Sequence, residues 1–211
     1  MISSKMNGGS RMQILKEDIK NRIIAAALEE FKEQGYLGAS IRNIASNAGI
    51  ALGTIYKYFK NKEDLFNSLV EPVYNDVLLT LKDSIDSSIN PICTVIDIKD
   101  VILDIFKVKN KELLILFDKS KGSKFENFKE EMISVIHIIL QKELMQQLKE
   151  RDIEVKDPFI CYVLSTTLLE GVYTLLRTQE DGVRISILVD QLIHIIFTDI
   201  EKRFEEISHI F

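Results

Sequence analysis

The stretch Ile41–Phe59, IRNIASNAGIALGTIYKYF, combines small residues and two glycines with a final cluster of aromatic side chains. Ile44, Ala45 and Ala48 recur at helical spacing, and Gly49 then ends this first helical segment. A second short helix begins almost at once, so the two helices must meet at a steep angle through a tight turn. The stretch therefore predicts a helix-turn-helix.

Small side chains explain how two helices can approach this closely. Ala45 is expected where they cross, because a larger group would push them apart, and Gly49 permits a positive φ in the turn. The second helix is expected over residues 51–59, with a first turn of little bulk that can come close to a partner surface. The wedge between the two helices is expected to be filled by isoleucines, namely Ile44, Ile50 and Ile55.

The flanking sequence completes a small domain. A helix is predicted from Lys16 to a stop at Gly35, and Ser40 stands where a helix N-cap belongs. Asn61 is placed to cap the next helix. We therefore predict a disordered N-terminal tail over residues 1–15 and a three-helix domain over residues 16–62.

Charge is divided unevenly along the chain, whose net charge is -5. Residues 1–62 hold ten Lys or Arg and five Asp or Glu, which gives +5, while residues 63–211 carry -10. A basic end on an acidic body can bind a polyanion at that end, with ordinary surface charge as the alternative, and the charge alone does not decide between the two. Composition, with 46% hydrophobic and 28% charged residues, is typical of a folded globular protein.

The cysteines and histidines do not indicate a metal site. Cys93 and Cys161 lie far apart, and the three histidines, His137, His194 and His209, are isolated in the sequence. We expect neither a disulfide framework nor a cofactor, and a reducing cytoplasm as the location.

The rest of the chain reads as long helices that form a larger body over residues 63–211. The predicted spans are Asn61–Asp86 with a bend at Pro72, Ile92–Val108, Lys111–Lys119, Ser123–Glu150, Asp157–Thr178 and Gly182–Ile210. SKFE at Ser123 is taken as a capping box, and Asp157 as the cap before Pro158.

The last two predicted helices are apolar on more than one face. Their surplus apolar surface predicts a homodimer in which two copies of this helix pair form a four-helix interface. A thicker monomeric core is the alternative. Residues 159–176 contain a single charge, Glu170, and its polar neighbours favour a helix buried in protein over one in a membrane.

The run from Ile23 to Phe66 resembles the N-terminal domain of the TetR family of bacterial transcription regulators. The resemblance is carried, at the family's spacing, by Ala27, Phe31, Gly35, Tyr36, Ile44, Ala45, Gly49, Gly53, Thr54, Tyr56, Phe59, Lys62 and Leu65. It implies an all-α homodimeric repressor with a helix-turn-helix that binds a palindromic double-stranded DNA operator. It also implies a larger helical domain that dimerises and binds a small-molecule inducer.

Carried over by position, the resemblance assigns the DNA contacts to Ser40, Leu52, Gly53, Thr54, Tyr56, Lys57, Tyr58 and Lys62. Leu52, Gly53 and Lys57 are expected nearest the bases, and the others mainly on phosphates. Ala51 departs from the family's usual Ser or Thr, so no side-chain contact is expected from it.

A ligand cavity is expected between the middle helices and the helix from Asp157. Its candidate lining is Phe106, Phe117, Phe128, Met132, His137, Cys161, Tyr162, Thr166, Glu170 and Tyr173. Glu170 either attracts a cationic ligand or pairs with Arg177 or Tyr173.

Two other functions stay open at this point. One is a helical-bundle enzyme that uses His137 or Cys161, although no catalytic residues are recognisable in the sequence. The other is an adaptor that binds a protein through its acidic body.

Overall fold

The computed structural model describes residues 8–87 and 91–208, with side chains for 13–79, 103–142 and 144–207. Within these ranges the chain forms nine helices and no strand, which confirms the predicted all-α class. The helices are α1 (Gly8–Gly38), α2 (Ile41–Asn47), α3 (Leu52–Ile55), α4 (Lys62–Ser87), α5 (Pro91–Asp118), α6 (Phe128–Glu150), α7 (Phe159–Thr178), α8 (Gly182–Phe197) and α9 (Ile200–Ser208).

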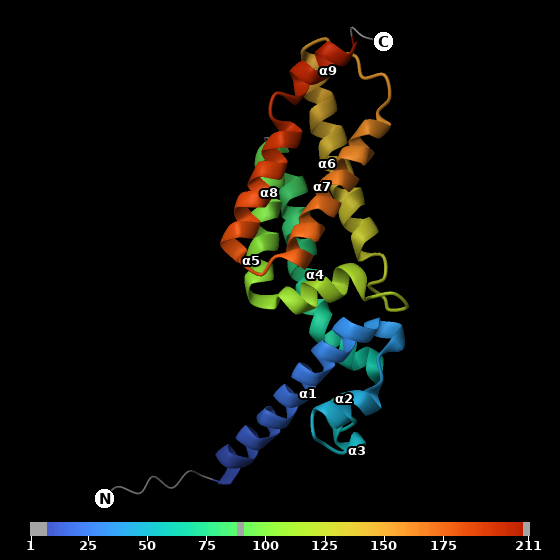
Figure 1. Cartoon of the computed structure of the whole chain (residues 1–211), viewed down its shortest axis with the longest axis vertical. Coiled ribbons are helices and arrows are strands. Elements are labelled where there is room, and N and C mark those ends of the chain that lie inside the picture. Colours follow the sequence, from blue (N-terminus) through green and yellow to red (C-terminus); the bar gives the residue numbers. More distant parts are fainter. Residues whose placement is uncertain (1–7, 88–90, 209–211) are drawn as a thin grey trace, which may run out of the picture.

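The molecule is elongated, with a small group of helices at one end. Figure 1 shows α1, α2 and α3 together at that end, and α4 leading from them into a bundle with α5, α6, α7 and α8. α9 lies at the opposite end, beside the C-terminus. This arrangement agrees with the predicted small N-terminal unit on a larger helical body.

α1 differs from its prediction at both ends. Residues 8–15 are helical, so the predicted disordered tail is wrong for them, whereas residues 1–7 lie outside the described part of the chain. At the other end Gly35 has φ 67° and ψ 170°, which breaks the helix at the predicted stop. The chain then makes one further turn, to Gly38.

The body helices differ from the prediction where local turns intervene. SKFE does not start α6: Ser123 Oγ accepts from Phe125 N at 3.1 Å, and Glu126 accepts from Gly122 N at 2.9 Å, so these residues form a turn before Phe128. The predicted span Gly182–Ile210 is two helices, because Asp199 adopts φ 50° between α8 and α9. Ile210 lies outside the described residues.

The two predicted helices before residue 120 are joined into α5. Lys109, with φ -134° and ψ 48°, interrupts the helical geometry at the predicted boundary between them. The predicted caps of α4 and α7 are confirmed, because Asn61 Oδ1 accepts from Asp64 N at 2.8 Å and Asp157 Oδ1 accepts from Phe159 N at 2.9 Å.

One continuous core joins the small end to the body. Aromatic rings succeed one another from α1 to α7, with neighbouring centroids between 4.9 and 6.4 Å apart. The series runs through Phe31, Phe66, Phe125, Tyr74, Phe128, Phe117 and Tyr173. Because these rings are in contact, displacement of one end of the core must be accommodated by the other.

α7 is the helix, among those described, that is long and apolar enough to cross a membrane, with a mean hydropathy of 1.5. A third of that apolar window, 33%, is buried inside the fold. A Cβ atom on Gly171 would lie 2.6 Å from Leu192 Cδ2, so α7 packs very closely on α8. Helices in the core of a bundle share this composition, so it is no evidence for a membrane span.

Tyr74 generates a prediction about alkaline stability. Its hydroxyl donates to Glu131 Oε2 at 2.8 Å, and burial together with the Glu131 carboxylate raises its pKa to about 12. The folded chain therefore keeps a proton that the unfolded chain loses near its ordinary pKa of 10.0, so stability falls as pH rises through about 12. In Tyr74→Phe, the free energy of unfolding measured by urea should decrease less between about pH 10 and pH 12 than in the original chain. The same pH dependence in both proteins would contradict the assignment.

Candidate nucleic-acid interface

The angle between α2 and α3 is set by the residues that the sequence singled out. Ala45 is 3% exposed, and Ile44 and Ile55 are fully buried between the helices. Gly49 has φ 64°, and Ile50 N donates to Ala45 O at 3.0 Å across the turn. The helix-turn-helix predicted from the sequence is thus present in this geometry.

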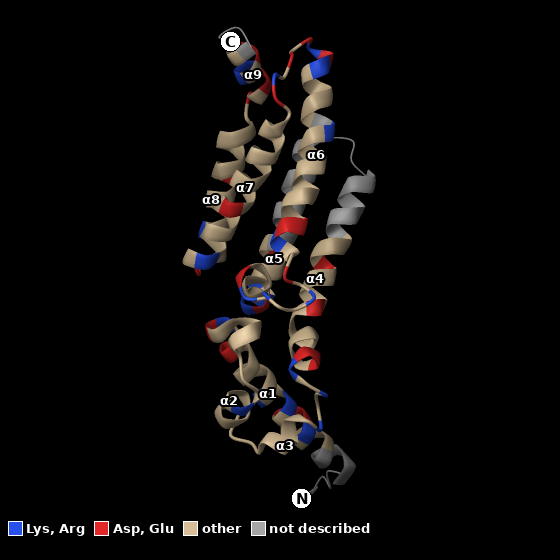
Figure 2. Cartoon of the chain, turned by 90° about the vertical axis from the view of Figure 1, so that its right-hand side faces the viewer, with Lys and Arg blue, Asp and Glu red and all other residues tan. Residues whose placement is uncertain are grey.

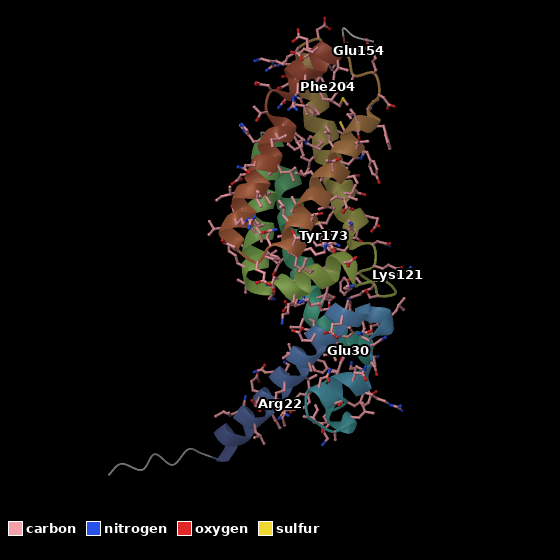
Figure 3. All side chains as sticks on the ribbon, viewed as in Figure 1. Arg22, Glu30, Lys121, Glu154, Tyr173 and Phe204 are labelled. Carbon is pink, nitrogen blue, oxygen red and sulfur yellow. The ribbon has the colours of Figure 1, made fainter. Side chains whose placement is uncertain are left out.

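Arg22 of α1 fastens the turn. Its guanidinium donates to Ala48 O at 2.5 Å and to Gly49 O at 3.2 Å. Figure 3 shows Arg22 on the stretch of α1 that runs beside α2 and α3. The positive φ of Gly49 favours glycine, and a Cβ atom there would lie 2.9 Å from Arg22 Nη2, so the guanidinium would have to move.

Glu30 holds the start of α2. It is 5% exposed, and its Oε1 accepts from Ser40 N at 2.9 Å and from Asn43 Nδ2 at 3.1 Å. Ser40 Oγ in turn accepts from Arg42 N at 3.3 Å, which confirms Ser40 as the N-cap. Because a buried carboxylate needs such donors, Glu30 fixes α2 to α1.

α3 is shorter than predicted, and its side chains divide into inward and outward groups. The helix ends at Ile55 and a turn carries the chain to Phe59, with Ile55 and Phe59 buried. Ala51 stands at its N-cap without a side-chain hydrogen bond, as its departure from the family pattern predicts. The outward group, which we call the recognition face, is Gly53, Tyr56 and Lys57.

The residues of the recognition face are exposed to solvent. Tyr56 is 52% exposed, and Lys57 and Gly53 are exposed beside it. A Cβ atom on Gly53 would meet no atom within 4 Å, and Gly53 does not have a positive φ. The fold itself therefore does not require glycine at this position, whereas a partner that approaches the backbone closely would.

The other predicted DNA contacts are less exposed. Leu52, Thr54 and Tyr58 are half-buried, and Leu52 and Tyr58 pack against the core. Ser40 is half-buried and occupied as a cap. Leu52, Thr54 and Tyr58 are sequence neighbours of the recognition face, and all four residues remain predictions as DNA contacts.

Lys62 has a structural role that the sequence did not predict. Its ammonium donates to three backbone carbonyls, Tyr36 O at 2.7 Å, Leu37 O at 3.2 Å and Ala39 O at 3.3 Å. It also lies 4.8 Å from the centroid of the Tyr36 ring. Since an ammonium group has three donors, the predicted contact of Lys62 with a phosphate has no donor in this conformation.

Sequence reasoning did not single out two exposed cations of the helix-turn-helix region. Arg42 lies in the first turn of α2, and Lys60 lies just beyond the turn that follows α3. Figure 2 shows Lys and Arg distributed around this end of the molecule. The positive charge of residues 1–62 could have drawn attention to both, because neither has a place in the apolar helix pattern.

The body contains a cavity where it meets α1. This junction cavity, of about 600 Å³, is lined from α1 by Lys32, and otherwise by Phe106, Asn110, Lys111, Leu114, Ile115, Asp118, Lys119, Tyr173, Leu176, Arg177, Gln179 and Glu180. A distal cavity of about 350 Å³ lies among α7, α8 and α9 and includes Phe204 and Glu154. Figure 3 shows these two residues at the end of the body opposite Tyr173 and α1.

The ten predicted ligand-binding residues do not all gather around the junction cavity. Phe106 and Tyr173 line it, while Phe117, Phe128, Met132 and Cys161 are buried core residues. His137 packs edge-on against Tyr162, and Thr166 Oγ1 donates to Tyr162 O at 3.0 Å. Glu170 pairs with Lys129, so the predicted pairing with Arg177 or Tyr173 is wrong.

The residues named for an enzyme are poorly placed for catalysis. Cys161 is completely buried, and burial raises the pKa of its thiol, which disfavours the nucleophilic thiolate. His137, the alternative residue named for catalysis, packs edge-on against the Tyr162 ring. Within the described residues no group of three or more His, Cys, Asp or Glu could hold a metal ion.

The geometry of α1, α2 and α3 defines a helix-turn-helix domain with an outward recognition face. Residues 23–69 match the family described as bacterial regulatory proteins, tetR family, which confirms the resemblance seen in the sequence. The N-terminal domain of this chain is therefore a tetR-family domain. The fatty acid metabolism regulator protein of Bacillus subtilis is 42% identical over 64 residues, which cover 30% of this chain and 33% of that protein.

Solved structures resemble nearly the whole fold. A TetR-family transcriptional regulator from Bordetella parapertussis has a TM-score of 0.64 at 17% identity, covering 85% of this chain and 94% of that one. FadR from Bacillus subtilis, in complex with stearoyl-CoA, has a TM-score of 0.51 at 18% identity, covering 85% and 98%. The chain matches the curated relative over about a third of that protein's length.

Two glycine substitutions separate folding from partner contact. Gly53→Ala should keep or raise the melting temperature, because open space surrounds the new methyl group and alanine favours helix, yet lower affinity for duplex DNA at least about fivefold. Gly49→Ala should lower the melting temperature, because it strains the turn and pushes Arg22. Thermal unfolding and fluorescence anisotropy measure both. If Gly53→Ala bound duplex DNA with unchanged affinity, the recognition face would not be the surface that contacts DNA.

Proposed function

We propose that the chain is a DNA-binding transcriptional regulator that acts as a ligand-released repressor. The observation that carries the proposal is the recognition face itself, where Gly53 on α3 and Tyr56 and Lys57 in the turn that follows are exposed, while buried residues hold α3 against α2. Lys57 and Tyr56 can donate to phosphates or base edges in the major groove, and Gly53 lets the backbone approach. A regulator of chromosomal DNA would work in the cytoplasm.

A homodimer would present two recognition faces to one operator. Large apolar side chains are exposed on α7 and α8, among them Phe159 at 61%, Val183 at 71%, Ile187 at 53% and Ile195 at 71%. An isologous pairing of α7 and α8 with a second copy would cover them and give the two-fold axis of a palindrome. Half-sites are then expected about 34–36 Å apart, one turn of DNA.

Release by a small molecule is the third part of the proposal. The cavities of the body supply room for a ligand, and the FadR structure of the same fold contains stearoyl-CoA. A ligand that binds better to a conformation in which the recognition faces no longer fit successive grooves would weaken DNA binding by mass action.

The direct test of DNA binding uses Lys57. Lys57→Ala should lower affinity for a selected duplex between about fivefold and a hundredfold, because it removes a charged donor from the recognition face. Lys142→Ala, which removes an exposed cation from α6, serves as the matched control and should bind like the original chain. Fluorescence anisotropy at two salt concentrations measures both. Equal losses in the two variants would leave only non-specific attraction to explain the binding.

Ile187 offers a test of the dimer. Ile187→Glu should shift the protein towards monomers in sedimentation velocity and weaken operator binding, since it buries a charge in the proposed interface. Leu79→Glu changes a comparably exposed apolar residue on α4, 60% exposed, and should remain dimeric. Dimers that persist unchanged in Ile187→Glu would contradict an interface through α8.

A further inference from the structure

The junction cavity is built from both parts of the molecule. Lys32 comes from α1, Lys111 from α5, Lys119 from the residue after α5, and Tyr173 and Arg177 from α7. The distal cavity, in contrast, is lined from residue 154 onward and takes nothing from α1, α2 or α3. Of these two cavities, only the junction cavity would place a ligand in contact with α1, the helix against which the helix-turn-helix packs.

The walls of the junction cavity favour a negatively charged ligand. Four cations line it, Lys32, Lys111, Lys119 and Arg177, against two acids, Asp118 and Glu180. This positive surplus lies against a body of residues 63–211 whose formal charge is -10. Between the charged groups the cavity has an apolar lining, formed by Phe106, Leu114, Ile115 and Leu176.

The cations are held by weak contacts that a ligand can replace. Lys111 pairs with Glu29 across the junction, with side chains 43% and 49% exposed, and Lys119 Nζ lies 3.7 Å from Asp118. Arg177 lies over the Tyr173 ring at 5.5 Å. Exposed ion pairs of this kind contribute little, whereas a carboxylate or phosphate would form charge-assisted hydrogen bonds to the same donors.

We propose that the junction cavity binds a small amphiphilic anion, with a carboxylate or phosphate head and a compact apolar body, and that this anion lowers DNA affinity. The binding site stands on the geometry alone, while the effect on DNA rests on the regulatory function proposed above. The head group contacts Lys32, Lys111 and Arg177, and the apolar part packs on Phe106 and Leu176.

Two contacts connect the cavity to the position of α1. The ion pair of Lys111 with Glu29 joins α5 to α1, and Tyr36 N donates to Lys119 O at 2.8 Å. An anion that binds Lys111 in place of Glu29 breaks this ion pair. It also occupies space beside the hydrogen bond between Tyr36 and Lys119. Because binding effects are reciprocal, DNA must then lower the affinity for the anion by the same factor.

The experiment compares two probes that share an apolar part and differ in head-group charge. Isothermal titration of the full-length protein with 4-phenylbutyrate should give binding, and with 4-phenylbutylamine none. The double variant Lys32→Gln, Arg177→Gln should weaken 4-phenylbutyrate binding at least about tenfold, since each lost charge removes a charge-assisted bond. Lys142→Gln, a neutralised cation on α6, should bind the probe like the original chain, and circular dichroism confirms that all variants are folded.

Each outcome decides a separate part of the proposal. Equal or tighter binding of the amine, no binding of the acid, or acid binding that survives in the double variant would overturn the anion site, whatever the protein does with DNA. Acid binding that leaves affinity for a selected duplex unchanged would overturn the regulatory effect and keep the site. A failure of the unliganded protein to bind any duplex would instead count against the proposed function, because the calorimetry contains no DNA.

Discussion

The position of the recognition face depends on how the C-terminal end of α1 is held. Gly35 interrupts the helix, and the freed carbonyls of the last turn accept the Lys62 ammonium from the start of α4. The backbone of Tyr36 is bound to Lys119 at the end of α5. Three segments distant in sequence thus meet at a single turn. Glu30 of α1 then fixes the start of α2, because its carboxylate accepts a hydrogen bond from Ser40 N. A change at this turn would displace α2 and α3 as a unit.

Core packing also joins the small end to the body. The aromatic series from Phe31 to Tyr173 is one core, so the small end and the body are packed together. Figure 2 shows Lys, Arg, Asp and Glu along both the small end and the body, and the net charge changes from +5 over residues 1–62 to -10 over residues 63–211. A polyanion would therefore be attracted at one end and repelled along the body.

What could be predicted from the sequence is what depends on neighbours in sequence. Ala45, Gly49 and Ser40 act within a few residues of their partners, and their roles follow from helix and turn rules. Lys62 could not be assigned in this way, since its acceptors lie 23 to 26 residues away. The pairing of Glu170 with Lys129 was missed for the same reason.

The predicted ligand residues show the limit of helical patterns. A pattern identifies side chains that face inward, and Phe128 and Met132 do so, but it does not say whether they fill a core or line a cavity. The junction cavity became visible only when α1, α5 and α7 were brought together, and most of its cations would otherwise read as ordinary solvated charges. The start of α6 and the break at Asp199 were decided by turns that periodicity does not register.

The most direct measurement is selection of duplexes from a random pool by the full chain, followed by footprinting of the enriched site. If two recognition faces read DNA together, the selected site should contain two inverted half-sites whose centres lie about 34–36 Å apart, protected on one face of the helix. If no sequence were enriched, or only a single half-site protected by one copy of the protein, the claim that two recognition faces bind one operator together would be contradicted.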